Sequence, residues 1–199
     1  PNIEGFGVWA AKCNFTMGPD GKMYSRMLGG NLVRIDVENA RGENLTNGDL
    51  VGTKDGSAYG LVFDPQDENV FYFSNNDKHC IYKYDLRTKE CACWAGQEGK
   101  SGYLDGPIGQ AMFNKPGQMC VDSEGNIILT DTENHCIRKI TMSTGYVSTL
   151  AGKPQNSGYV NGSAEDAQFK KPLGICIDND DVMYIGDSEN RAIRRLAVE

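Results

Sequence analysis

The stretch DTENHCIRKI, residues 131–140, and the stretch DSENRAIRRL, residues 187–196, share the order acid, acid, asparagine and basic residue. They lie 56 positions apart, and the same offset aligns the residues before them without a gap. The aligned residues include Gly102, Tyr103, Phe113, Pro116, Cys120 and Asp122, which fall on Gly158, Tyr159, Phe169, Pro172, Cys176 and Asp178. Self-similarity at a fixed period is the signature of a repeat architecture, so this register decides the fold.

Four repeat units follow from the register. The offset also carries His79 and Cys80 onto His135 and Cys136, which places another copy upstream. A weaker copy, NFTMGPDGKMYSRMLGGNLVRIDV, begins at Asn14. The units are expected in a single domain, at residues 9–56, 57–116, 117–172 and 173–199.

Short strands separated by turns fill each unit. In the third unit the runs rich in Val, Ile and Thr predict strands at 118–122, 126–131, 136–141 and 146–151, with turns at SEG, TEN and STG. Helical periodicity is nowhere sustained, and runs such as GICI lack the alternation of a half-solvated sheet. Four antiparallel strands per unit at this period are typical of a propeller blade. The expected fold is therefore an all-β propeller.

These residues resemble the NHL-repeat family of β-propellers. KPGQMCVD at 115–122, DTENHCIRKI at 131–140 and TLAG at 149–152 carry the resemblance, and KPLGICID and DSENRAIRRL follow in the fourth unit. The match covers residues 57–199 well and residues 9–56 only by position. The linkers AGQEGKSGYLDGPIGQAMFNKP and AGKPQNSGYVNGSAEDAQFKKP are similar to those of bacterial secreted or surface members, which often follow an IPT/TIG domain.

The resemblance implies a ring of about six blades, whereas four units are visible. The chain is therefore expected to be the C-terminal part of a larger propeller, with missing blades or an upstream domain. If these residues close a ring alone, the segment from Pro1 to Val8 is expected to supply a strand beside 192–198, because an open sheet edge invites aggregation.

Composition argues against several classes of partner. Acidic residues outnumber basic ones by 27 to 20, and the net charge of -7 disfavours nucleic acid. No apolar run approaches the roughly 18 residues of a spanning helix, so membrane insertion is not expected. Seven cysteines cannot all pair internally, and their spacing does not fit a zinc module. They are expected to be free, mostly buried thiols.

A candidate binding face follows from strand order. The turn between the second and third strands and the linker between blades should emerge on the same face. Polar and aromatic side chains gather in these segments: His79, His135, Arg191, Glu133, Glu189, Tyr103, Tyr159 and Asp105. Such a face suits recognition of sugars or peptides, on which rings stack and polar groups orient the ligand.

The repeated Asp131 and Asp187 have a structural interpretation. Asp and Asn side chains bond nearby backbone amides and tolerate the left-handed conformation, so they are expected to stabilise the tight turn that closes each blade. In this interpretation the last residue of the turn, His79, His135 or Arg191, is the one free to specialise.

Metal-dependent chemistry is the alternative. Zinc-dependent amidating lyases of this propeller type need three histidines, and the third equivalent position holds Arg191, which cannot bind a cation. Propeller lactonases hold calcium with carboxylates and Asn, for which Asp131, Asp187 and Asn75 are the candidates. That alternative is a calcium-dependent hydrolase or lactonase-like enzyme.

The sequence therefore predicts a noncatalytic propeller that binds a protein or glycan ligand through a polar face. It is expected to be extracytoplasmic, at a bacterial cell surface or in a periplasm, and to need no resident cofactor.

Overall fold

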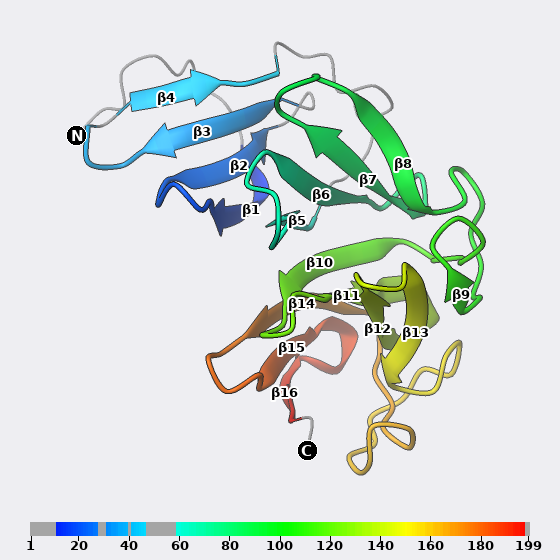
Figure 1. Ribbon diagram of the computed structural model, residues 1–199. Coiled ribbons are helices and arrows are strands. Elements are labelled where there is room, and N and C mark those ends of the chain that lie inside the picture. Colours follow the sequence, from blue (N-terminus) through cyan, green and yellow to red (C-terminus); the bar gives the residue numbers. More distant parts are fainter. Residues whose placement is uncertain (1–10, 28–30, 40, 47–58, 198–199) are drawn as a thin grey trace.

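Figure 1 shows the computed structural model, which describes residues 11–27, 31–39, 41–46 and 59–197. Its elements are β-strands and two short 3-10 turns, η1 (Thr132–Asn134) and η2 (Ser188–Asn190). No helix in these described ranges is long and apolar enough to cross a membrane. The strand expected from Pro1 to Val8 lies outside the described residues.

Four antiparallel sheets follow one another along the chain, one for each predicted repeat unit. The first holds β1 (Ala11–Met17), β2 (Met23–Met27), β3 (Leu32–Asp36) and β4 (Arg41–Asn44). The second holds β5 (Leu61–Phe63), β6 (Val70–Asn75), β7 (Cys80–Asp85) and β8 (Cys91–Gly96). The third holds β10 (Pro116–Val121), β11 (Ile127–Asp131), β12 (Cys136–Thr141) and β13 (Tyr146–Ala151), with β9 (Gly106–Pro107) on the outer edge of β13. The fourth holds β14 (Pro172–Ile177), β15 (Met183–Asp187) and β16 (Ala192–Leu196).

The four strands predicted for the third unit are all present, and the last two coincide with β12 and β13. β10 begins two residues before its predicted start, because Pro116 pairs with Asp131 beyond an irregularity in the ladder. β9 is a two-residue strand that pattern alone did not predict, and it pairs with Tyr146 and Val147. The all-β propeller fold is therefore confirmed.

The sheets are arranged as propeller blades, with β1, β5, β10 and β14 as neighbouring innermost strands (Figure 1). Apolar side chains of successive blades interlock between the sheets. Tyr72 and Ile81 of the second blade pack with Ile127 and Leu129 of the third. Phe113 is buried in the same cluster, so the linker before the third blade fills the gap between the two sheets.

The thiols only partly follow the expectation of burial. The six described as free thiols include Cys80, Cys120 and Cys136, which are buried. Cys91 and Cys93 are half-buried, and Cys176 is exposed. Cys176 repeats the position of Cys120, but β14 packs beside Cys120 and no described strand packs in the same way beside Cys176. Equivalent positions therefore differ in burial because their neighbours differ.

Candidate functional site

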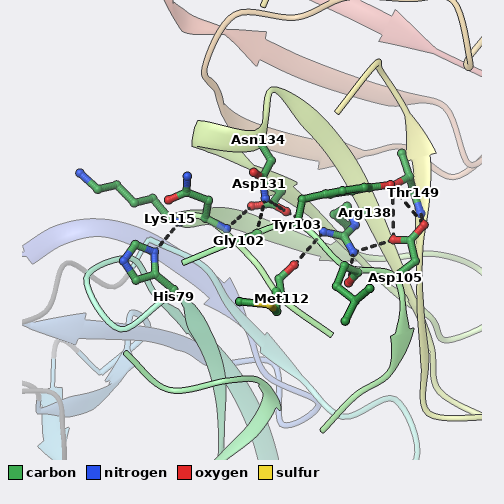
Figure 2. Close-up of polar contacts among 12 residues, drawn as sticks. His79, Gly102, Tyr103, Asp105, Met112, Lys115, Asp131, Asn134, Arg138 and Thr149 are labelled. Carbon is green, nitrogen blue, oxygen red and sulfur yellow. Dashed lines mark hydrogen bonds and ion pairs between the residues drawn. The ribbon is translucent and has the colours of Figure 1, made fainter. Parts of the chain in front are cut away.

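A buried ion pair within the third blade also holds the linker that precedes this blade (Figure 2). Arg138 on β12 is fully buried, and its guanidinium donates to Oδ2 of Asp131 at 2.7 Å. Nδ2 of Asn134 also donates to Oδ2 of Asp131, at 2.8 Å, and to the carbonyl of Gly102, at 2.8 Å. The backbone N–H of Asn114 donates to Oδ1 of Asp131 at 2.8 Å. We call Asp131, Asn134 and Arg138 the linker network of the third blade.

Arg138 also organises the linker segment GYLDG (Figure 2). One guanidinium nitrogen donates to Oδ1 of Asp105 at 2.6 Å and to the carbonyl of Leu104 at 3.0 Å, and the other donates to the carbonyl of Met112 at 3.2 Å. The guanidinium carbon lies 4.8 Å from the centre of the Tyr103 ring, within the range of a cation–π contact. Arg138 is therefore a structural centre for this linker.

The fourth blade repeats this arrangement with one change. Arg194 donates to Asp187 at 2.9 Å and to the carbonyls of Val160 and Gln168, and its guanidinium lies 4.9 Å from the Tyr159 ring. Asn190 donates to Asp187 at 2.8 Å. The change is at the position equivalent to Asp105, which holds Asn161. Arg194 therefore has no carboxylate there to match the one that Asp105 gives to Arg138.

The second blade lacks the ion pair. Asn75 and Tyr82 occupy the positions of Asp131 and Arg138. Oδ1 of Asn75 accepts the backbone N–H of Lys78 at 3.1 Å. The network is therefore a feature of the third and fourth blades.

The aspartates hold the turn through its asparagine side chain rather than through the backbone amides of the turn. The Asp131 and Asp187 side chains make no capping bond to η1 or η2. Each also accepts hydrogen bonds from a backbone N–H of the linker and from a buried arginine. The left-handed residues are His135, at φ 59°, and Arg191, at φ 53°, and not Asp or Asn.

The proposed calcium ligands already have other partners. Both carboxylate oxygens of Asp131 accept hydrogen bonds, and so do both of Asp187, which binds Arg194, Asn190 and the N–H of Lys170. A calcium ion would have to displace an arginine at each of them. Within the described ranges no three His, Cys, Asp or Glu side chains are grouped to hold a metal ion.

The two histidines fasten each blade to the next linker. The backbone N–H of Lys115 donates to Nδ1 of His79 at 3.1 Å (Figure 2), and that of Lys171 donates to Nδ1 of His135 at 3.2 Å. All four residues have positive φ angles, between 50° and 59°. The histidines therefore share a structural contact, whereas the side chain of Arg191 is exposed.

Acidification is expected to weaken the His79 contact. Burial and the nearby Lys115 lower the pKa of His79, so the folded state favours the neutral imidazole that accepts this bond. The stabilisation should be complete above the ordinary histidine pKa of about 6.5 and be lost as pH falls from there through the lowered pKa. We expect thermal denaturation between pH 7.5 and 5.0 to show a smaller loss of melting temperature in His79→Asn than in the parent. Asn tolerates positive φ and keeps an acceptor oxygen, so an unchanged pH slope in this variant would contradict the assignment.

The remaining acids of the predicted face pair with lysines at the start of the fourth blade. Nζ of Lys171 lies 3.4 Å from Glu133 and 3.0 Å from Glu189, and Nζ of Lys170 lies 3.4 Å from Glu189. The backbone N–H of Glu133 donates to the carbonyl of Asn114 at 3.0 Å. The structure thus brings turn and linker together, as predicted. Most polar side chains of the predicted face, however, already bind other residues of the chain.

Sequence reasoning missed the buried arginines, which lie within the repeated stretches DTENHCIRKI and DSENRAIRRL. Their signal was the arginine seven residues after the repeated aspartate, at Arg138 and Arg194. Tyr159 is the aromatic residue of the predicted face that stays open, with 60% of its surface exposed.

Comparison with known proteins agrees with this architecture. Residues 113–140 match the model of the NHL repeat. NHL repeat-containing protein 2 of Gallus gallus is 30% identical over 152 residues, which cover 75% of this chain and 19% of that protein. This chain thus spans a small part of that relative.

Two solved structures from Bacteroides thetaiotaomicron are each 28% identical to the chain and are covered by it over 46% of their own length. One is a structural genomics protein, with a TM-score of 0.84 over 93% of this chain. The other is described as an auxiliary nutrient binding protein, with a TM-score of 0.73 over 92% of this chain. Lyase structures at 15 to 16% identity show the fold alone. The chain therefore carries an NHL repeat and is an NHL-type β-propeller.

Proposed function

We propose that this chain is a noncatalytic binding module that recognises a protein or carbohydrate ligand through the face formed by its linkers and turns. The observation that carries the proposal is the mounting of Tyr159. Its ring is largely exposed, yet the guanidinium of Arg194 packs on it at 4.9 Å. Arg194 is itself fixed by Asp187 and by linker carbonyls. Tyr159 is therefore an aromatic platform that is ordered before a ligand arrives.

Such a platform suits a ligand with a flat apolar surface and polar edges. A ring that is already held in place loses little conformational freedom on binding, so more of the contact energy appears as affinity. The exposed Arg191 follows Asn190, whose side chain bonds to the carbonyl of Gly158 beside Tyr159. The turn that carries the exposed Arg191 is thus tied to the linker that carries the ring, and the two segments supply the charged and aromatic groups that suit sugar and peptide recognition.

The similarity to a nutrient binding protein supports a binding role over catalysis. The partners of the repeated aspartates support it as well, because carboxylates already paired with buried arginines are poor candidates for calcium ligands. An extracytoplasmic location and an upstream IPT/TIG domain stay predictions of the linker resemblance.

Removing the exposed ring should weaken ligand binding. On glycan and peptide arrays we expect the parent chain to bind a ligand. We expect Tyr159→Ala to raise the Kd for that ligand about tenfold, as for the loss of a central aromatic contact. Tyr146→Ala is the matched control, because Tyr146 is 47% exposed at the start of β13, at the opposite end of the blade. Equal binding by parent and Tyr159→Ala would refute this assignment of the face.

A further inference from the structure

A concave site lies on the propeller axis, between the innermost strands of the four blades. This axial pocket has a volume of about 890 Å³, within the range of small-molecule sites. Val121 and Ile177, the last residues of β10 and β14, line it. The linkers enter these strands at their other ends, at Pro116 and Pro172. The axial pocket is therefore at the opposite end of the molecule from Tyr159.

The wall of the axial pocket is mainly apolar. It includes Met119 and Ile175 from the innermost strands, and Cys176, whose thiol is exposed. Phe15 and Met17 on β1 are 52% and 60% exposed beside it. Large apolar side chains exposed in a hollow are a usual mark of a ligand site, and methionine adapts its shape to different ligands. An apolar body of moderate size therefore fits this pocket.

The charged residues that line the axial pocket are all acidic. They are Asp64 and Glu68, from the turn between β5 and β6. Asp64 is held in place by the hydroxyl of Tyr72, which donates to it at 2.7 Å, and by the N–H of Gln66 at 2.8 Å. Neither carboxylate forms an ion pair with a lysine or arginine among the described residues, whereas Asp122, which follows β10 in the third blade, has Lys139 at 3.0 Å. The rim thus carries uncompensated negative charge, which attracts a cation and repels an anion.

From the shape, the apolar wall and the acidic rim together, we propose that the axial pocket binds an organic cation with an apolar body, such as an arylalkylammonium. The body would lie against Phe15, Met17 and Ile175, and the ammonium would face Asp64 and Glu68. This site uses none of the residues of the face formed by the linkers and turns, so its test is independent of the test of the function proposed above.

A set of three probes tests the charge preference. The compounds 3,3-diphenylpropylamine, 3,3-diphenylpropanol and 3,3-diphenylpropionate share one apolar body and differ in charge. In calorimetric titrations at neutral pH we expect the ammonium to bind about 3- to 10-fold more tightly than the alcohol, and the carboxylate to bind most weakly. The double variant Asp64→Asn, Glu68→Gln should remove this preference and leave the affinity for the alcohol unchanged. A carboxylate that binds as well as the ammonium would overturn the proposal.

Cys176 lines the axial pocket, so its reactivity reports the location of the probe. We expect the ammonium to slow disulfide-reagent labelling of Cys176, with little effect on the half-buried Cys91 and Cys93, which do not line the pocket. Cys176→Phe should fill the pocket and weaken binding by about tenfold. Ile193→Phe is the control for added bulk on the same sheet, because Ile193 is 75% exposed and lies outside the pocket. Unchanged affinity in Cys176→Phe, or loss of binding in Tyr159→Ala, would place the probe elsewhere and refute the site.

Discussion

Replacing Arg138 with methionine is expected to lower the free energy of unfolding by about 3–5 kcal/mol, the usual effect of removing one partner of a buried ion pair. The substitution leaves the Asp131 carboxylate buried without its cation. It also removes the donors that satisfy the linker carbonyls of Leu104 and Met112. Urea denaturation followed by circular dichroism measures the change.

The second blade supplies the control for this experiment. It carries Asn75 and Tyr82 where the third blade carries Asp131 and Arg138, and it folds without the ion pair. The double variant Asp131→Asn, Arg138→Tyr should therefore be less destabilised than Arg138→Met, although it changes one more residue. A loss below about 1 kcal/mol in Arg138→Met would show that the linker network contributes little to stability.

Replacing Phe113 with alanine is expected to destabilise the fold by a similar amount, about 3–5 kcal/mol. The ring is fully buried between the second and third blades, in the cluster that contains Tyr72 and Leu129. It also packs on the guanidinium of Arg138, with 5.2 Å between the guanidinium carbon and the ring centre. Removing the ring leaves a cavity between the two sheets. Neither sheet can move to fill this cavity, because the hydrogen bonds between its own strands hold it in place.

Two further variants, measured by thermal and urea denaturation, separate two contributions to this loss of stability: the cavity and the lost aromatic contact. Phe113→Leu keeps most of the volume and should lose less than half as much stability as Phe113→Ala. Phe169→Ala removes the equivalent ring between the third and fourth blades, in the cluster with Ile128 and Ile185. A change below about 1 kcal/mol for Phe113→Ala would contradict the role of this ring as a filler between blades.

The blades could be predicted from the sequence because their strands depend on local pattern. The offset of 56 residues aligns turn residues and apolar runs together, and β12 and β13 coincide with the predicted ranges. β9 could not be predicted, since two residues carry no periodicity and their pairing with β13 depends on the path of the linker.

The linker network was not predictable by the same reasoning. Arginine is rarely fully buried, so the pattern alone does not predict the burial of Arg138. Its burial depends on partners from two other segments, Asp131 at the end of β11 and, in the linker, Asp105 with the neighbouring carbonyl of Leu104. The shared face of turn and linker followed from strand order, but the histidine contacts required the left-handed conformations of Lys115 and Lys171, which nothing in the sequence marked.

The range of the contacts between blades has a consequence for how the chain is made. Side-chain hydrogen bonds that link the third sheet to the fourth join residues 40 to 58 positions apart, from Thr132 with Pro172 to Ser123 with Asp181. Each blade therefore needs only the unit synthesised just before it, as in other chains stabilised by nearest neighbours. We expect the chain to assemble progressively as it leaves the ribosome, each new sheet docking on a surface that is already formed.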